Sequence, residues 1–200
     1  MRRLIGIVLI AALCVPVFAD AKKAKDLVKK AEIEFDRRNI PGAEKLLRKA
    51  AEEDPDNLDA HRELADLLAM TNRYSQSVPE YRKTLEIDDQ QKALTREQRR
   101  SIVDSLGVST ARSGDLKKAR DWYLEALRKD PDYSFYNYNL ACVYAELGDL
   151  DSAIPYLKKA WEKRDTMPSG MSFPDPRQDD SFKNFVNDPQ FQDAVRNMVL

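Results

Sequence analysis

The sequence predicts an all-α protein, built as a solenoid of four helical hairpins with a C-terminal capping segment. Three observations support this prediction. Apolar residues recur at helical spacing in paired stretches, short Gly-Asp turns separate the stretches, and the pattern returns every 34 residues. In the clearest hairpin, Leu140, Ala141 and Tyr144 share one face of the first helix. The second helix has an apolar face made of Ala153, Ile154, Leu157 and Ala160.

The turn of this hairpin is explained by two residues. Gly148 suits the end of a helix because glycine accepts a positive φ angle there. Asp149 can accept hydrogen bonds from the free N–H groups at the start of the next helix. Gly114 and Asp115 form the same pair one repeat earlier. A connection this short predicts two antiparallel helices.

Four segments share the 34-residue frame: 24–57, 58–91, 100–133 and 134–167. Small residues occupy fixed positions that let the paired helices approach closely. These are Ala31, Ala65, Gly107 and Ala141 in the first helices, and Ala43, Ser77, Ala119 and Ala153 in the second helices. Pro55 and Pro131 each follow a second helix and end the repeat, because proline cannot continue the helix.

This pattern of small, small, aromatic or leucine, small and proline residues resembles the tetratricopeptide repeat family. The four copies cover roughly two-thirds of the chain. The resemblance implies a helical solenoid that binds other proteins through a concave groove and has no catalytic activity.

Two segments depart from the frame. An eight-residue insertion, Lys92 to Arg99, separates the second and third copies, and Thr95 with Gln98 resembles a capping box. We therefore expect the first helix of the third copy to begin about one turn early. Residues 168–200 begin as a loop rich in Pro, Ser, Gly and Asp and end in a helix that starts near Asp188. Since a solenoid exposes an apolar face at its end, this segment is expected to be the C-terminal cap.

The first 19 residues predict a signal peptide. Arg2 and Arg3 precede an apolar run from Leu4 to Phe18, followed by small residues at Ala19 and Ala21. We expect export to the periplasm of a Gram-negative bacterium. The alternatives are an uncleaved membrane anchor and a lipid anchor at Cys14, although Leu13 is not the small residue that a lipoprotein signal requires there. Cleavage would leave Cys142 as the single cysteine, so no intramolecular disulfide could form.

The charge balance argues against a polyanionic partner. The chain has 33 basic and 34 acidic residues, a net charge of −1, and removal of residues 1–19 would leave 31 basic residues and a net charge of −3. No basic stripe compensates for this balance, so we expect no nucleic-acid partner. We also expect no membrane insertion of the mature chain.

The sequence contains few candidate catalytic or metal-binding residues. His61 is the only histidine, and no histidine lies near Cys142 in sequence, so neither forms a recognisable catalytic or metal-binding arrangement. The sequence has no glycine-rich phosphate loop, and the acidic run Asp175–Asp180 lacks the glycine and glutamate of a calcium loop. We expect no enzymatic activity, no cofactor and no metal. An enzyme that uses unpaired carboxylates is the third-ranked alternative.

The resemblance places positions 2, 5, 9 and 12 of each first helix in the concave groove. The predicted partner-binding groove consists of Arg62, Asp66, Asp104, Val108, Arg112, Phe135, Tyr138, Asn139 and Cys142. Its aromatic end suits a peptide or a partner helix. The alternative is that Phe135 and Tyr138 pack against the third repeat or the C-terminal segment.

These features predict a non-catalytic adaptor that binds another protein of the cell envelope. The runner-up hypothesis is a structural scaffold whose groove takes up its own C-terminal segment or a second copy of the chain. The lysine-asparagine clamp by which related proteins hold a terminal carboxylate is not expected, because Val28 and Glu32 occupy its first two positions.

Overall fold

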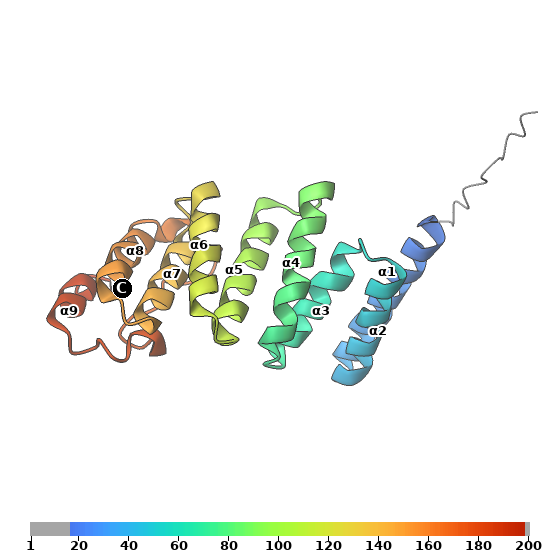
Figure 1. The fold of residues 1–200 in the computed structure, drawn as a ribbon, viewed down its shortest axis with the longest axis horizontal. Helices are drawn as coiled ribbons and strands as arrows, with labels where there is room; N and C mark the ends of the chain where they lie inside the picture. The colour runs from blue at the N-terminus through green and yellow to red at the C-terminus, as the bar shows by residue number, and fades with distance from the viewer. Residues whose placement is uncertain (1–16, 199–200) are drawn as a thin grey trace, which may run out of the picture. The chain divides into compact units, whose positions relative to one another are not determined.

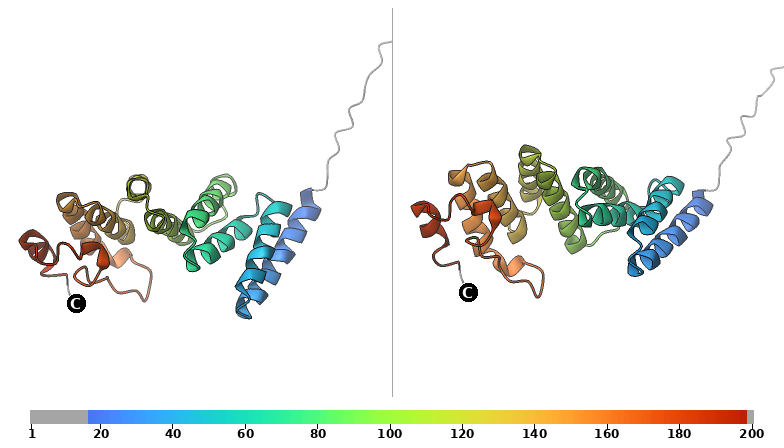
Figure 2. Two further views of the ribbon diagram at one scale, coloured as in Figure 1. Left: turned by 60° about the horizontal axis from the view of Figure 1, so that its bottom comes forward. Right: turned by 90° about the horizontal axis from the view of Figure 1, so that it is seen from below.

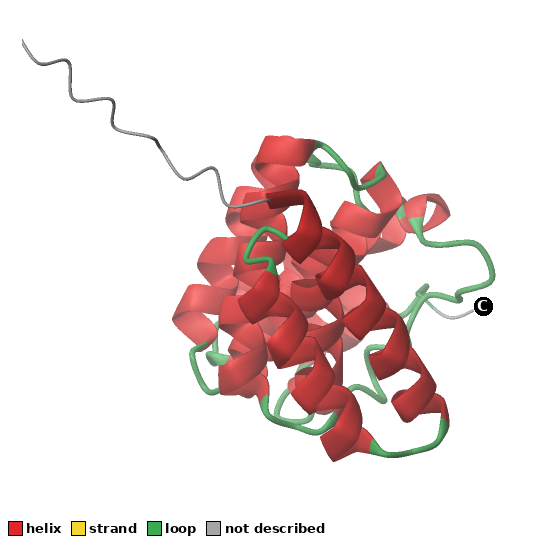
Figure 3. Cartoon of the chain, turned by 90° about the vertical axis from the view of Figure 1, so that its right-hand side faces the viewer, coloured by secondary structure: helices red, strands yellow, loops and turns green. Residues whose placement is uncertain are grey.

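The computed structural model describes residues 17–198, which form helices, turns and loops without a strand (Figures 1 and 3). Residues 1–16, and with them most of the predicted signal peptide, lie outside the described residues. Within residues 17–198, no helix combines the length and the apolar character that crossing a membrane requires. The chain divides into two compact units, Met1–Ala60 and His61–Leu200.

The first unit is a single helical hairpin. Helix α1 (Val17–Asp36) packs against α2 (Ile40–Glu53). Their interface contains the fully buried Ala24, Ala43 and Ala50, with Ala31 and Leu47 almost completely buried. Asn39 caps α2 by accepting a hydrogen bond from the Gly42 amide at 3.2 Å. Small residues let the two helices approach closely, as the repeat frame predicts.

The second unit continues with paired helices and a C-terminal segment (Figure 1). Its helices are α3 (Leu58–Met70), whose first turn belongs to the first unit, α4 (Tyr74–Gln91), α5 (Arg96–Arg112), α6 (Leu116–Lys129), α7 (Ser134–Glu146) and α8 (Leu150–Glu162). Helix α5 packs on α4 and α6, and α7 packs on α6 and α8. The first helices α5 and α7 also contact each other directly.

The positions that define the repeat form the core of this unit. Tyr81, Leu106, Tyr123 and Leu140 are each at most 2% exposed. Gly107 lies against the Tyr123 ring so closely that a Cβ atom at this position would overlap the ring. The glycine at the small position of the third repeat is therefore required by the close approach of α5 and α6.

The turn inside each hairpin has the same backbone conformation in all four repeats. Arg38, Asn72, Gly114 and Gly148 occupy equivalent positions and have φ angles of 61°, 59°, 95° and 81°. Glycine supplies this left-handed conformation at the lowest cost in the third and fourth repeats. The repeat frame thus predicts the turn in the first two copies as well, where no glycine is present.

The insertion between the second and third repeats lengthens two helices. Helix α4 has 18 residues and α5 has 17, whereas α6 has 14. Thr95 caps α5 and forms the expected capping box with Gln98, so α5 begins about one turn early. The Asp88 carboxylate fixes the short connection, because its Oδ1 accepts a hydrogen bond from the Leu94 amide at 2.9 Å.

The C-terminal segment folds back over α7 and α8 (Figure 2). It contains two short 3-10 helices, η1 (Arg164–Thr166) and η2 (Asp180–Phe182), and helix α9 (Pro189–Val195). Helix α9 contacts α8, and η2 contacts α7. Phe182 and Phe191 are fully buried there, with ring centroids 5.3 Å apart. The segment covers the last hairpin with aromatic side chains.

Candidate functional site

The predicted groove residues of the second unit lie on α3, α5 and α7, and the structure separates them into three groups. On α3, the Asp66 carboxylate accepts a hydrogen bond from the Tyr81 hydroxyl at 2.7 Å. Arg62 Nη1 lies 3.7 Å from Asp66 Oδ2. The Asp66 side chain remains 51% exposed. This part of the predicted groove is therefore charged and accessible to solvent.

The second group lies on α5 and faces solvent. Val108 is 38% exposed, so its aliphatic side chain is accessible to a partner. Arg112 follows one turn later and is also exposed. Together they present an exposed apolar contact beside a positive charge.

Between the first helices, Asp104 forms a partly buried polar contact. Its carboxylate accepts a hydrogen bond from Asn139 Nδ2 at 2.5 Å, which joins α5 to α7. The Tyr123 hydroxyl donates to the Asp104 backbone carbonyl at 3.1 Å. Burial raises the pKa of Asp104 from its ordinary value of 3.8 to about 6, although the hydrogen bonds from Asn139 and Tyr123 oppose this shift. Asp104 and Asn139 thus hold two repeats together.

We expect the substitution Asp104→Asn to stabilise the protein at pH 7.5. In the unfolded chain the Asp104 carboxyl loses its proton near its ordinary pKa of 3.8, and in the folded chain near pH 6. Between these values the folded state binds a proton that the unfolded state does not, so stability falls as the pH rises. The neutral amide of the variant avoids this loss and keeps a carbonyl acceptor for Asn139. The free energy of unfolding should rise by about 1–3 kcal/mol at pH 7.5.

Urea denaturation at pH 7.5 and pH 4 measures this effect, and the difference between variant and parent should shrink at the lower pH. Asp121→Asn, on the exposed side of α6, is the control for loss of a negative charge. A variant that is less stable than the parent at pH 7.5 would show that the ionised carboxylate strengthens the contact with Asn139.

The third group, at the aromatic end, is covered by the chain itself. Tyr138 is 4% exposed, and its hydroxyl donates to Asp179 Oδ2 at 2.8 Å. The Phe173 ring meets the Tyr138 ring edge-on, with centroids 5.4 Å apart. Cys142 is buried beside the same Asp179 carboxylate, with Sγ 3.8 Å from Oδ2. The open aromatic groove expected at Tyr138 and Cys142 is not formed, because the C-terminal segment lies on it.

Phe135 is also part of the packing. It is half-buried, and its ring centroid lies 6.1 Å from that of Tyr133. Tyr133 in turn packs against Tyr136 in the core between α6 and α7. Phe135 therefore joins the third-repeat packing, which is the alternative that the sequence left open for it.

Neither Cys142 nor His61 is arranged for catalysis. Burial raises the pKa of the Cys142 thiol well above its ordinary value, so the thiol remains protonated at neutral pH. His61 Nδ1 lies 2.6 Å from Glu80 Oε2, which joins α3 to α4. Among residues 17–198, no cluster of three or more His, Cys, Asp and Glu side chains could hold a metal ion.

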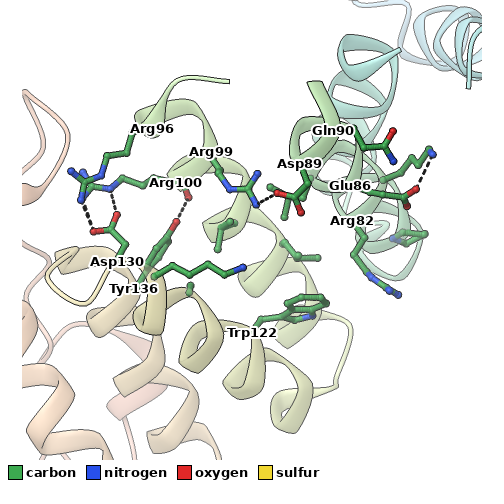
Figure 4. Close-up of a pocket in the computed structure, with 17 residues that line it drawn as sticks. Arg82, Glu86, Asp89, Gln90, Arg96, Arg99, Arg100, Trp122, Asp130 and Tyr136 are labelled. Carbon is green, nitrogen blue, oxygen red and sulfur yellow. Dashed lines mark hydrogen bonds and ion pairs between the residues drawn. The ribbon is translucent and has the colours of Figure 1, made fainter. Parts of the chain in front are cut away.

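Two features of the site were missed by sequence reasoning. The first is the set of residues that cover α7, namely Phe173, Asp179 and Phe182. The sequence left open that Tyr138 packs against the C-terminal segment, but it did not identify these three residues as the contacts. The second is a cavity between α4, α5 and α6, with Arg82, Arg100 and Trp122 in its wall (Figure 4). The insertion at Lys92–Arg99 was the sequence signal for this cavity.

The fold and these surfaces define a class of helical-hairpin repeat proteins in which the first helices of successive repeats lie side by side. Tetratricopeptide repeat models match residues 34–96 and residues 122–154. These matches identify tetratricopeptide repeats in both segments, in agreement with the repeat frame. A search of curated proteins finds no sequence match.

Solved structures share this fold at low sequence identity. A structure described as "MamA MSR-1 C2" is 21% identical, with a TM-score of 0.60, and the match covers 74% of this chain and 80% of that chain. YrrB, described as a TPR protein with an unusual peptide-binding site, is 14% identical with a TM-score of 0.59. That match covers 91% of this chain and 93% of YrrB.

Proposed function

We propose that the protein is a non-catalytic interaction module that binds a segment of another protein along the first helices of the second unit. The observation that carries this proposal is the binding of the C-terminal segment on α7. There the chain places Phe173, Phe182 and Asp179 over Tyr138 and Cys142. A first-helix surface of this repeat thus accepts a partly extended segment with aromatic and acidic side chains.

The surface of α5 is proposed to receive the partner. Val108 supplies an exposed apolar contact and Arg112 a nearby positive charge, while the corresponding surface of α7 is already covered. Apolar residues flanked by charged groups are typical of surfaces that bind peptides and helices. The description of YrrB as a protein with a peptide-binding site agrees with this use of the fold.

We further propose that the protein acts in the periplasm and that its partner is another protein of the cell envelope. This part of the proposal is based on the basic, apolar and small residues at the N-terminus. The self-associating scaffold remains the competing hypothesis, and cross-linking from α5 distinguishes it from an adaptor.

A photoreactive amino acid at Val108 should cross-link to a second protein in the periplasmic fraction. Val108 is suited to this test because its exposed side chain makes the substitution compatible with folding. The control places the same amino acid at Lys158, an exposed position on α8. Mass spectrometry should identify one partner protein that is cross-linked from position 108 and not from position 158. The substitution Arg112→Glu should reduce the yield of this cross-linked product.

Adducts formed equally from both positions would contradict binding on α5. Adducts between two copies of this chain would instead support the scaffold. Cross-linking with a defined partner only in a cytoplasmic fraction would reject the proposed location while leaving the binding surface supported.

A further inference from the structure

A cavity of about 870 Å³ lies between α4, α5 and α6, and neither Val108 nor Arg112 lines it. Figure 4 shows the residues that form its walls. Helix α4 forms one wall, α6 forms the other, and α5 lies between them, with Tyr136 of α7 at the edge. All of these residues belong to the second unit. This volume falls in the range of binding sites for small ligands and peptide side chains.

The insertion after the second repeat builds the upper part of this cavity. The extra turn of α4 carries Asp89 and Gln90, and the extra turn of α5 carries Arg96 and Arg99. Arg99 Nη2 lies 2.7 Å from Asp89 Oδ1, which holds the two lengthened helices beside each other. An uninterrupted 34-residue repeat would lack these turns. The cavity wall is thus specific to the inserted sequence.

The lining of the cavity contains more basic than acidic side chains. Six are basic (Arg82, Lys83, Arg96, Arg99, Arg100 and Lys129) and three are acidic (Glu86, Asp89 and Asp130). Arg96 and Arg100 share the single carboxylate of Asp130, at 2.8 Å and 2.6 Å. One negative charge is thereby left to balance two positive charges, which favours a further anionic group at this end of the cavity.

At the other end, Arg82 has no carboxylate partner among the residues that the structure describes. Its guanidinium carbon lies 5.8 Å from the centroid of the Trp122 ring. Trp122 itself has an indole N–H that is shielded from solvent and has no acceptor in the described part of the chain. A buried donor without an acceptor is unusual in a folded protein. The Arg82 guanidinium therefore favours an acidic group from outside the chain, whereas the shielded Trp122 N–H lies behind the cavity wall.

The floor between these charged ends is apolar. Leu85, Val103, Leu106 and Ala126 line it, one or two from each of the three helices. An apolar side chain of a ligand could be buried there while anionic groups on either side reach the arginines. Glu86 and Asp89 in the same lining would repel a continuous polyanion, so a nucleic acid is disfavoured.

We propose that this cavity is a second binding site, which takes an acidic segment of another protein anchored by an aromatic or aliphatic side chain. The anchor occupies the floor formed by Val103 and Leu106. Carboxylates of the segment pair with Arg82 at one end and with Arg96 and Arg100 at the other. The site is independent of the surface around Val108, because its residues lie on other faces of the helices.

A synthetic peptide tests this site directly. The probe is a fluorescein-labelled decapeptide of glycine and serine with one central phenylalanine and one glutamate on each side of it. Its binding to the full chain is measured by fluorescence anisotropy. We expect saturable binding that weakens as salt is added, because charged contacts are screened. Arg82→Glu should weaken binding at least tenfold. Arg82 makes no ion pair in the described residues, so the variant is expected to fold like the parent, and circular dichroism checks this.

Three controls make the result specific. Lys158→Glu makes the same charge reversal at an exposed position on α8. Its affinity for the peptide should stay within twofold of the parent's. A peptide with alanine in place of phenylalanine should bind at least fivefold more weakly, and one with lysine in place of glutamate should not bind. Trp122 emission, read in a Trp161→Phe background, should change on binding of the parent peptide.

The proposal is overturned if Arg82→Glu and Lys158→Glu bind the probe equally, or if no saturable binding occurs. It is also overturned if sodium sulfate, at the same concentration of negative charge as the peptide, displaces the peptide completely. The cavity would then be a simple anion site. If the chain self-associates and Arg82→Glu abolishes this self-association, the cavity binds a second copy of the chain. That result would also reject an acidic partner protein. None of these outcomes depends on cross-linking at Val108.

Discussion

Deletion of residues 181–200 is expected to lower the thermal midpoint of the second unit by about 10–20 °C. The deletion removes Phe182 and Phe191, which are fully buried, and Val195, which is 1% exposed. Each contributes about 1.5–3 kcal/mol through its removal from water. At the lower end of this range, the three side chains together account for a loss on the order of 5 kcal/mol. For a chain of this size, each kcal/mol lost from the free energy of unfolding lowers the thermal midpoint by about 2–4 °C.

The physical reason is that the last hairpin has no further repeat to cover it. Helix α9 packs on α8, and η2 packs on α7, so the deletion would expose the apolar residues beneath both. Circular dichroism melts of the parent and truncated chains measure the effect. Met171→Ala is the matched control in the same segment, because Met171 is 60% exposed and its removal should change stability by less than about 0.5 kcal/mol. A truncated chain that melts with the parent would show that the segment is not a cap.

Tyr138→Ala is expected to reduce the free energy of unfolding by about 3–5 kcal/mol, the range for truncating a buried large aromatic side chain. The ring packs edge-on against Phe173 and Phe182. Its hydroxyl donates to Asp179, and burial raises the pKa of the Tyr138 hydroxyl above its ordinary value, so the hydroxyl remains a donor at neutral pH. Alanine would leave a cavity on α7 and remove one hydrogen bond from the Asp179 carboxylate.

Tyr138→Phe separates these two contributions. It keeps the ring and removes only the hydroxyl, so the loss should be about 1.5–3 kcal/mol, the value for a hydrogen bond to a charged group. Urea denaturation of the two variants measures both losses. An alanine variant as stable as the parent would place Tyr138 on an open surface and restore the aromatic groove that the sequence analysis expected.

The closed end of the groove changes where a partner can bind. The predicted groove had Phe135 and Tyr138 at its aromatic end, with Cys142 beside them. In the structure, Phe135 joins the packing beside Tyr133, and the C-terminal segment covers Tyr138 and Cys142. The accessible first-helix surface is therefore the part around Val108 and Asp66. This is why the cross-linking experiment uses position 108.

Several local features could be predicted because they depend on residues close together in the chain. Gly148 adopts a positive φ angle, and Asp149 caps α8 by accepting from the Ser152 amide at 3.0 Å. Thr95 and Gln98 form the expected capping box. Pro41 lies in the first turn of α2, where its missing N–H costs no helical hydrogen bond. Each of these features is decided within about four residues of sequence.

The repeat frame could be read from the sequence alone, because small and large apolar side chains at fixed spacing leave one way to pair the helices. Leu106, Gly107 and Tyr123 are buried together as that frame requires. Which faces remain open, in contrast, depends on tertiary contacts. Tyr138 occupies a groove position in the repeat, but whether the C-terminal segment covers it depends on contacts such as that with Asp179, 41 residues away. The cavity beside Trp122 likewise depends on tertiary contacts, because it is lined by α4, α5 and α6 together and helix periodicity fixes the face of each helix but not its neighbour.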